Sequence, residues 1–306
     1  SRSAQPCQRT PSQPTRARPT AVSRLNSEKP LSGRVALITG ANTGIGLVTA
    51  RELARQGARL FIACRSGARS QPAVEQIRAA SGNAQVEALA LDLGDFASVR
   101  QCAQIFLARD LPLHLLVNNA GLAGTRGLTA SGFELAFGVN HMGHFLLTDL
   151  LLERIKASAP ARIVTVASRA HTRTSGIDWD AVRKPTRTRT AIEEYAVSKL
   201  ANVWFSAELG RRLAGSGVTT YALHPGVVAS DLWRSLPWPL RPLIKLRMIS
   251  TEDGALTTLH CASAPELASE SGLYYDLCRQ RTPSRLGQDQ ALAAELWRRS
   301  AAWLTA

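Results

Sequence analysis

Short apolar runs recur along the chain, and stretches with helical periodicity separate them. The runs span 34–39, 59–64, 85–91, 114–117, 162–166 and 218–223. Continuous apolar runs of this length are typical of strands buried on both faces, as in a parallel sheet. Strands that alternate with helices of ten or more residues predict right-handed crossover connections. The pattern therefore predicts an α/β fold in which one doubly wound parallel sheet carries helices on both faces.

Start signals mark several of the helical stretches. The second stretch opens at Pro72, and Ser250 is an N-cap signal three residues before Asp253. The predicted helices cover 47–56, 70–81, 96–109, 140–154, 191–209, 250–262 and 288–304, and a last strand covers 272–275. Residues 31–306 contain no linker, repeat or low-complexity tract, so we expect a single domain of the Rossmann type.

The first thirty residues differ in composition from the rest. Residues 1–30 are rich in Pro, Ser, Thr, Gln and Arg and hold few large apolar side chains, which predicts disorder. Six basic residues against one acidic residue give them a net charge of +5, out of a formal +14 for the chain. The remainder is still basic, which favours a phosphorylated cofactor or an anionic membrane surface. We expect no nucleic-acid partner, because no nucleic-acid-binding module is recognisable.

Other partners and sites are disfavoured by what the sequence lacks. No run of about 18 apolar residues exists, so we expect no transmembrane segment in this chain. The five cysteines are odd in number and scattered, and no CxxC pair occurs among them. This usage is typical of reduced thiols in a cytosol-facing protein and indicates neither a disulfide framework nor a zinc site. We interpret His141 and His144 as packing or surface histidines, because no acidic partner stands at metal-site spacing.

A glycine-rich turn follows the first predicted strand and opens the first helix. This arrangement of strand, turn and helix places a diphosphate at a helix N-terminus. Gly40 would allow the tight turn, Gly44 the close approach of phosphates, and Gly46 the packing of the helix on the sheet. The predicted cofactor contacts in this turn are Gly40, Asn42, Thr43, Gly44, Ile45 and Gly46.

The ends of the later strands carry further candidate cofactor residues. After the second strand stands Arg65, where a site for NAD(H) usually has an acid. An arginine there can pair with a 2′-phosphate, so we predict NADP(H) as the cofactor, although Arg65 could also be an ordinary surface cation. Asp92 and Leu93 would contact the adenine, Asn119, Ala120 and Gly121 would lie under the cofactor, and Pro225, Gly226 and Val228 would shape the nicotinamide pocket.

Tyr195 and Lys199 stand four residues apart in a predicted helix, so their side chains share one face. A neighbouring cation favours the phenolate, which predicts a lowered pKa for Tyr195 and a role in proton transfer. Ser168 ends the fifth strand, where its hydroxyl could polarise a substrate carbonyl. Asn140 lies at the start of the helix predicted over 140–154.

These motifs together resemble the short-chain dehydrogenase/reductase family. The matching segments are 39–46, 118–121, Asn140, Ser168, Tyr195 with Lys199, and 224–226, which cover 31–228. Segments 63–65, 139–148, 198–203 and 217–226 resemble the retinol dehydrogenase branch more closely. The resemblance implies a lipophilic aldehyde or alcohol substrate, NADP(H), a location on the endoplasmic reticulum membrane and a homodimer through the Asn140 and Tyr195 helices.

The resemblance also implies a role for each catalytic candidate. Tyr195 would be the general acid, and Lys199 would lower its pKa and bind the nicotinamide ribose. Ser168 would orient the carbonyl, and Asn140 would hold a water that links Lys199 to solvent. The chain departs from the branch in two places, because a polar basic segment replaces a hydrophobic anchor and a basic loop, 183–189, stands between Ser168 and Tyr195.

Residues 227–250 stand where the family places its variable substrate loop. Aromatic and aliphatic residues alternate here with arginine and lysine. This composition suits a lid over a long apolar substrate, an element on a membrane interface, or a segment that packs on the core. We predict a substrate lid that takes a retinoid or lipid aldehyde. The alternatives are a steroid or xenobiotic carbonyl substrate, and a non-catalytic scaffold that binds NADP.

Overall fold

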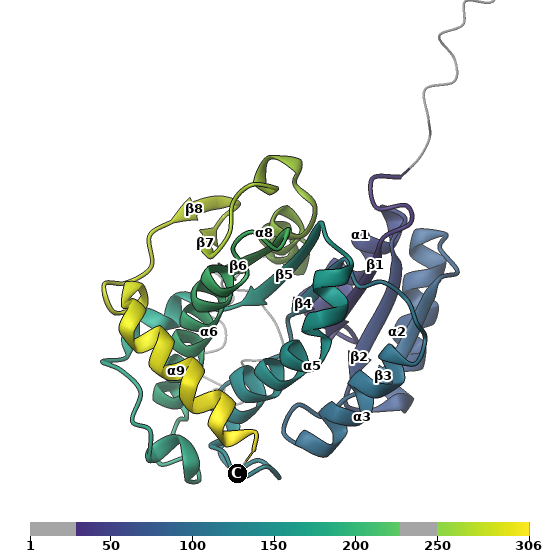
Figure 1. Ribbon diagram of the computed structural model, residues 1–306. Coiled ribbons are helices and arrows are strands. Elements are labelled where there is room, and N and C mark those ends of the chain that lie inside the picture. The colour runs from purple at the N-terminus through teal and green to yellow at the C-terminus, as the bar shows by residue number, and fades with distance from the viewer. Residues whose placement is uncertain (1–28, 227–249, 306) are drawn as a thin grey trace, which may run out of the picture.

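The predicted apolar runs form neighbouring strands of one sheet (Figure 1). The structure, a computed structural model, describes residues 29–226 and 250–305. Across these residues the sheet has the order β3-β2-β1-β4-β5-β6-β7-β8. The strands are β1 Val35–Thr39, β2 Arg59–Cys64, β3 Val86–Ala90, β4 Leu115–Asn118, β5 Ala161–Val166, β6 Val218–His224, β7 Leu273–Asp276 and β8 Arg279–Arg281. Because the strand order reverses between β1 and β4, the carboxyl ends of these strands border the crevice where ligands of such sheets bind.

The sheet is mainly parallel rather than wholly parallel. β1 to β7 pair in parallel, whereas β8 runs antiparallel to β7. The expectation that 272–275 is the last strand was therefore wrong. Leu277 and Cys278 connect β7 to β8 with φ values of 51° and 56°. Two positive φ angles are typical of a tight hairpin turn, but neither residue is a glycine or an asparagine, and β8 is exposed and polar.

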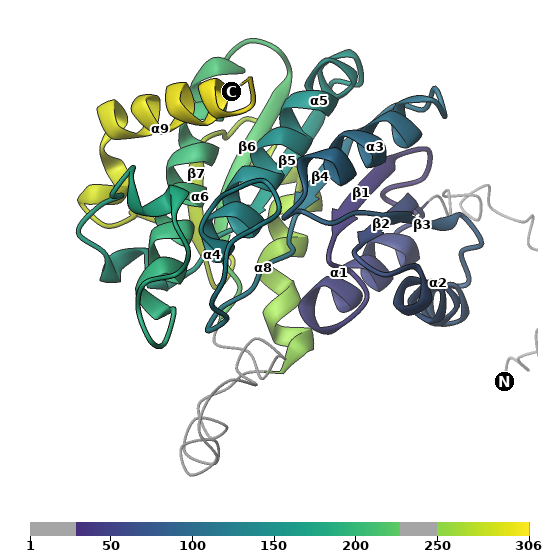
Figure 2. The ribbon, with the colours of Figure 1, turned by 90° about the horizontal axis from the view of Figure 1, so that it is seen from below.

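Helices cover both faces of the sheet, as predicted. They are α1 Gly44–Arg55, α2 Gly67–Ser81, α3 Phe96–Leu107, α4 Leu135–Phe137, α5 Gly143–Ala157, α6 Ile192–Arg212, α8 Thr251–Ser263 and α9 Gln290–Trp303. In Figure 2, α3, α5 and α6 lie on one side of the strands, and α1, α2 and α8 on the other. Each layer buries its own apolar cluster against the sheet. None of the helices in the described ranges is long and apolar enough to cross a bilayer.

Two helices begin earlier than their apolar pattern predicts. α1 starts at Gly44 instead of Leu47, so the glycine turn itself forms the first helical turn. α2 starts at Gly67 and holds Pro72 in its interior instead of at its start. The N–H of Ser70 donates to the carbonyl of Ser66 at 3.0 Å, which shows that the helix has formed before the proline.

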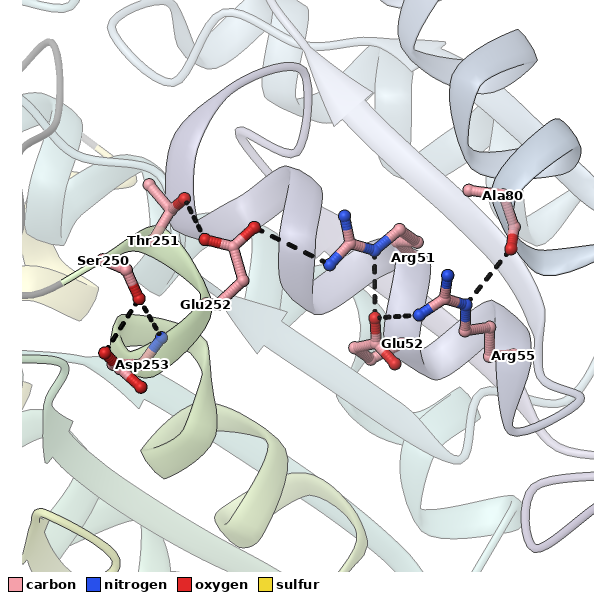
Figure 3. Close-up of polar contacts among 8 residues, drawn as sticks. All are labelled: Arg51, Glu52, Arg55, Ala80, Ser250, Thr251, Glu252 and Asp253. Atoms are coloured by element: carbon pink, nitrogen blue, oxygen red, sulfur yellow. Dashed lines mark hydrogen bonds and ion pairs between the residues drawn. The ribbon is translucent and has the colours of Figure 1, made fainter.

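The start of α8 confirms the predicted cap. The Ser250 hydroxyl accepts the N–H of Asp253 at 3.0 Å (Figure 3). Arg51 of α1 lies 3.9 Å from the carboxylate of Glu252, which joins the first turn of α8 to α1. Disorder was predicted for residues 1–30, and a substrate lid that includes Val228 was predicted over 227–250. Residues 1–28 and 227–249 lie outside the described residues.

The C-terminal helix α9 packs on α6, which carries Tyr195, and on α5, which follows Asn140 (Figure 1). The Trp297 ring lies 4.9 Å from Phe145 of α5 and 5.9 Å from Phe205 of α6, measured between ring centroids. His141 hydrogen-bonds Ser300 at 3.0 Å. α9 therefore occupies part of the surface through which the family resemblance implies a homodimer.

Candidate active site

A cavity of about 1380 Å³ lies at the carboxyl ends of the central strands. Every cofactor residue predicted above lines it except Val228, which lies outside the described residues. Ser168, Tyr195 and Lys199 line the same cavity. The cavity therefore brings together residues as far apart in the sequence as Gly40 and Thr251.

Two glycines allow the turn after β1 to approach the end of β4. A Cβ on Gly40, which has φ +68°, would lie 2.8 Å from the Cβ of Ala120. A Cβ on Gly46 would lie 2.5 Å from the side-chain nitrogen of Asn119 and from the carbonyl of Gly40. Real Cβ atoms do not approach other atoms so closely, so side chains are excluded at both positions. Gly46 thus allows the helix start to pack against Gly40 and Asn119, while its predicted role in packing the helix on the sheet stays a prediction.

The first turn of α1 faces the cavity with its N–H groups. Thr43, the N-cap residue, makes no side-chain capping bond within the described part of the chain, and the first turn holds no acidic residue. Such a helix end favours an anion. Arg65 is exposed and lines the cavity beyond β2. The close-packed glycine turn, the uncapped helix and this arginine fit a phosphorylated dinucleotide.

Asp92 also lines the cavity, after the end of β3. Its carboxylate accepts the N–H of Gly94 at 2.9 Å, which fixes the turn after β3. One oxygen has this partner, so the carboxylate keeps acceptor capacity toward the cavity. The contact to an adenine amino group stays a prediction.

Ser168 and Tyr195 lie within hydrogen-bonding reach of each other in the cavity lining. The Ser168 hydroxyl accepts the N–H of Ala170 at 3.1 Å, which leaves its own proton free to donate. The Ser168 carbonyl accepts a hydrogen bond from the His171 ring at 2.7 Å, and that ring accepts the N–H of Ser284 at 3.2 Å. His171 thus ties the segment after β5 to the chain beyond β8.

Lys199 is almost completely buried, and its ammonium donates to the carbonyl of Val166 at 2.9 Å. Burial lowers the pKa of Lys199 to about 7, because a charge loses its hydration there. Its nitrogen lies 5.6 Å from the centre of the Tyr195 ring. Two of its three donors remain after the bond to Val166.

The structure does not show the expected lowering of the Tyr195 pKa. Burial raises the pKa of Tyr195, and a hydrogen bond from Ser168 opposes that rise only in part. A lysine that titrates near pH 7 is only partly charged at neutral pH, so it favours the phenolate weakly. An anion bound in the cavity would favour the charged form of Lys199 and strengthen its effect on the phenol.

Asn140 lies behind the cavity wall and is not among the described residues that line it. It belongs to a π-helical turn, Gly138–Met142, that leads into α5. Its side-chain amide donates to the carbonyl of Leu122 at 3.0 Å, and its side-chain oxygen accepts the N–H of Leu122 at 2.9 Å. Asn140 therefore holds the chain just beyond Gly121, and its role toward a water stays a prediction.

Several residues that line the cavity near Ser168 and Gly121 were not predicted from the sequence. Arg169 and Arg173 follow Ser168 within one short helix, and Leu122 and Leu128 follow Gly121. Their position directly after strand ends was the available signal. Arg169 is held away from the cavity centre because it pairs with Asp276 at 2.6 Å, and Leu128 is a large apolar side chain left 46% exposed.

Comparison with known proteins agrees with this geometry. Residues 34–181 match the family model of the short chain dehydrogenases. The chain is 47% identical to retinol dehydrogenase 12 from Mus musculus over 274 residues. The alignment covers 87% of this chain and 85% of that protein. A solved structure of an uncharacterised protein from Mycobacterium paratuberculosis is 34% identical with a TM-score of 0.72, over 90% of this chain and 94% of that one.

A second solved structure carries a dinucleotide. The 3-ketoacyl-(acyl-carrier-protein) reductase from Brucella melitensis, complexed with NADH, is 25% identical with a TM-score of 0.63. The match covers 80% of this chain and 97% of that one.

Replacing Lys199 with methionine is expected to stabilise the ligand-free protein at pH 7. The folded-state pKa of Lys199, about 7, lies below its ordinary value of 10.5, so the unfolded chain binds one more proton between these values. Wild-type stability from this group therefore rises with pH across that window, by ~1.4 kcal/mol per pH unit. Urea unfolding of both proteins at pH 7, 8 and 9 should show the advantage of Lys199→Met shrinking; a constant difference would contradict the assignment.

Proposed function

The chain belongs to the short-chain dehydrogenase/reductase family and to its retinol dehydrogenase branch, and we propose that it uses NADP(H) to interconvert retinal and retinol. Members of the family are oxidoreductases that act on CH–OH groups with NAD(P) cofactors, and this chain is one of them. The observation that carries the proposal is that Ser168, Tyr195 and Lys199 share one cavity with the glycine turn and Arg65.

The mechanism follows from the donors that face the cavity. Bound NADPH would supply the hydride for the carbonyl carbon. Ser168 donates its free hydroxyl proton to the carbonyl oxygen and holds the carbonyl in place. As negative charge develops on that oxygen, Tyr195 gives it the phenol proton. Lys199 stabilises the resulting phenolate, and its two remaining donors would hold the nicotinamide ribose of the cofactor. The reverse transfers oxidise the alcohol.

The preference for NADP(H) over NAD(H) rests on Arg65. No acidic residue stands between Cys64 and Gly67, where a carboxylate would repel a 2′-phosphate. A guanidinium can bind a phosphate with two hydrogen bonds. The glycine turn and the first turn of α1 would hold the diphosphate. Asp92 would meet the adenine, and Pro225 with Gly226 would border the nicotinamide.

Retinal is the favoured substrate because the chain's relatives include retinol dehydrogenases at 44–47% identity. Leu122, Leu128 and Ala170 add apolar surface to the substrate end of the cavity. A steroid or xenobiotic carbonyl would use the same donors and is the second candidate. A non-catalytic NADP-binding scaffold would have no chemical need for Ser168, Tyr195 and Lys199 together.

Peripheral contact with the endoplasmic reticulum membrane, and a lid over 227–250, belong to the same proposal. The support for both is the alternation of apolar and basic residues in that segment. The homodimer stays a prediction. Because α9 packs on α5 and α6, two chains could meet through those helices only at the surface that α9 leaves uncovered.

Turnover of all-trans-retinal with NADPH tests the function directly. Wild-type protein should consume NADPH, and Tyr195→Phe, which keeps the ring and loses the acidic proton, should lower kcat by about 100-fold or more. Fluorescence titration of NADPH provides the control, because the variant should still bind the cofactor. Cofactor binding without turnover on retinal, steroid or aldehyde substrates would support the scaffold.

Replacing Arg65 with alanine tests the cofactor preference. The variant should bind NADPH about 10–100 times more weakly, because a charge-assisted bidentate contact to the 2′-phosphate is lost, and should bind NADH nearly as before. Arg55→Ala is the matched control, since it removes the same charge from an exposed site on α1 outside the cavity. Equal weakening for both dinucleotides would contradict the role of Arg65.

A further inference from the structure

His144 joins the glycine-turn side of the cavity to the catalytic side through buried hydrogen bonds. Its Nε2 lies 2.8 Å from the Thr39 hydroxyl at the end of β1. Its Nδ1 lies 3.0 Å from the carbonyl oxygen of Asn140. Thr39, Asn140 and His144 are each at most 1% exposed. Water cannot substitute for these partners, so the orientation of each group is set by its protein neighbours.

The direction of each hydrogen bond follows from the donors present. The Thr39 oxygen accepts the N–H groups of Asn119 at 3.0 Å and Ala120 at 2.9 Å. A hydroxyl oxygen has two lone pairs, so the Thr39 proton must point to His144, whose Nε2 accepts it. Nδ1 then carries the imidazole proton and donates to Asn140. Burial and the nearby Lys199 lower the pKa of His144 to about 4, which keeps the ring neutral.

The same chain of bonds continues from Asn140 to the catalytic helix. The Asn140 side-chain amide donates to the Ser198 hydroxyl at 2.9 Å. Ser198, which is completely buried, donates in turn to the carbonyl of Tyr195 at 2.7 Å. The Asn140 amide nitrogen uses its other proton on the Leu122 carbonyl, and the remaining donors in this series have one acceptor each. Thr39, His144, Asn140, Ser198 and Tyr195 therefore form one directed path from the end of β1 to the start of α6.

The π-turn explains why an imidazole is needed at this place. In it the N–H of Gly143 donates to the carbonyl of Gly138, five residues back, instead of following the α-helical pattern. The His144 ring supplies a donor to the Asn140 carbonyl within this turn. π-Turns are rare and are frequent at functional sites. The bond to His144 holds the Asn140 peptide in the orientation that lets its side chain reach Leu122 and Ser198.

His141 stands three residues earlier and is equally buried, but it does not join this path. Its Nε2 lies 3.0 Å from Ser300 of α9, and its ring packs 5.1 Å from Phe137, measured between centroids. Burial lowers its pKa to about 3, so it is neutral as well. His141 therefore matches His144 in burial and charge while its contacts lead away from the cavity.

We propose that His144 is a positioning residue for the reaction, which couples the cofactor turn at Thr39, Asn119 and Ala120 to Asn140 and Tyr195. The inference rests on the proposed function, because it concerns the placement of Tyr195, the general acid which that function requires. His144 lies behind the cavity wall and does not line it in the described part of the chain, so it acts through Asn140. Its loss should affect kcat and not the binding of either substrate.

The test compares His144→Phe with His141→Phe, using NADPH and all-trans-retinal. His144→Phe should lower kcat by about 10–100-fold, because small displacements of catalytic groups have effects of this size. Its KM for retinal and its Kd for NADPH should stay close to those of the wild type. His141→Phe should keep the wild-type kcat. Equal kcat for the two variants would overturn the proposal.

Rescue by asparagine separates positioning from packing. In His144→Asn the side-chain amide stands near the place of Nδ1 and can still donate to the Asn140 carbonyl. This variant should recover most of the lost kcat, although it leaves a smaller side chain in the core. If His144→Phe does not fold, Ser198→Ala removes the next link with the loss of one oxygen atom. It should lower kcat with Kd for NADPH unchanged, and a wild-type kcat would overturn the proposal.

Nitrogen-15 NMR of labelled histidine gives a readout that needs no turnover. At pH 7, in the NADPH complex and in the free protein, His144 should be the neutral Nδ1–H tautomer, with its proton protected from solvent exchange. An Nε2–H tautomer or an imidazolium would overturn the proposal. Failure of the proposed function would look different, because wild-type protein would then bind NADPH with the His144 tautomer intact and turn over no retinal.

Discussion

The contact between the end of β1 and the end of β4 is the constraint on which the rest of the site depends. Gly40 and Gly46 leave no room for a Cβ against Asn119 and Ala120. The Thr39 hydroxyl accepts the N–H groups of the same two residues. This contact forms where the strand order reverses, so it shapes the crevice and turns the first N–H groups of α1 toward it. A phosphorylated dinucleotide fits there because no side chain stands in its way.

Burial sets the chemistry at the other end of the cavity. Lys199 sits in the core with one carbonyl partner, and its charge is only partly retained at neutral pH. A buried lysine of this kind destabilises the fold. It is useful at a functional site, where its protonation state can change. The same burial raises the pKa of Tyr195, so the phenol keeps its proton at neutral pH. The lowered pKa of Lys199 and the raised pKa of Tyr195 suit a phenol that keeps its proton until an anionic ligand favours the charged form of the lysine.

Periodicity and motif spacing predicted the seven parallel strands, both helical layers and part of the cavity lining, mainly its cofactor side. They failed at the last strand, at the start of α2, and where contacts between residues distant in the sequence decide the structure. β8 has no apolar run and follows a turn of Leu277 and Cys278, so no sequence signal marked it. α2 begins before Pro72 because its first turn bonds back to Ser66. The π-turn at Asn140 and the packing of α9 on α5 depend on contacts over more than a hundred residues, which no local pattern encodes. The pKa direction of Tyr195 required its burial to be known.

The transfer of deuterium from the cofactor to the product shows whether the protein moves a hydride between NADPH and retinal. Two samples of NADPH would each carry deuterium on one face of the nicotinamide C4. Each would be incubated with all-trans-retinal and the wild-type protein, and the mass of the retinol would be measured by mass spectrometry. We expect retinol one mass unit heavier with one of the two labelled cofactors, and about 100-fold less labelled retinol in the same time with Tyr195→Phe. Retinol that carries deuterium from neither cofactor, or equal labelling without Tyr195, would contradict this expectation.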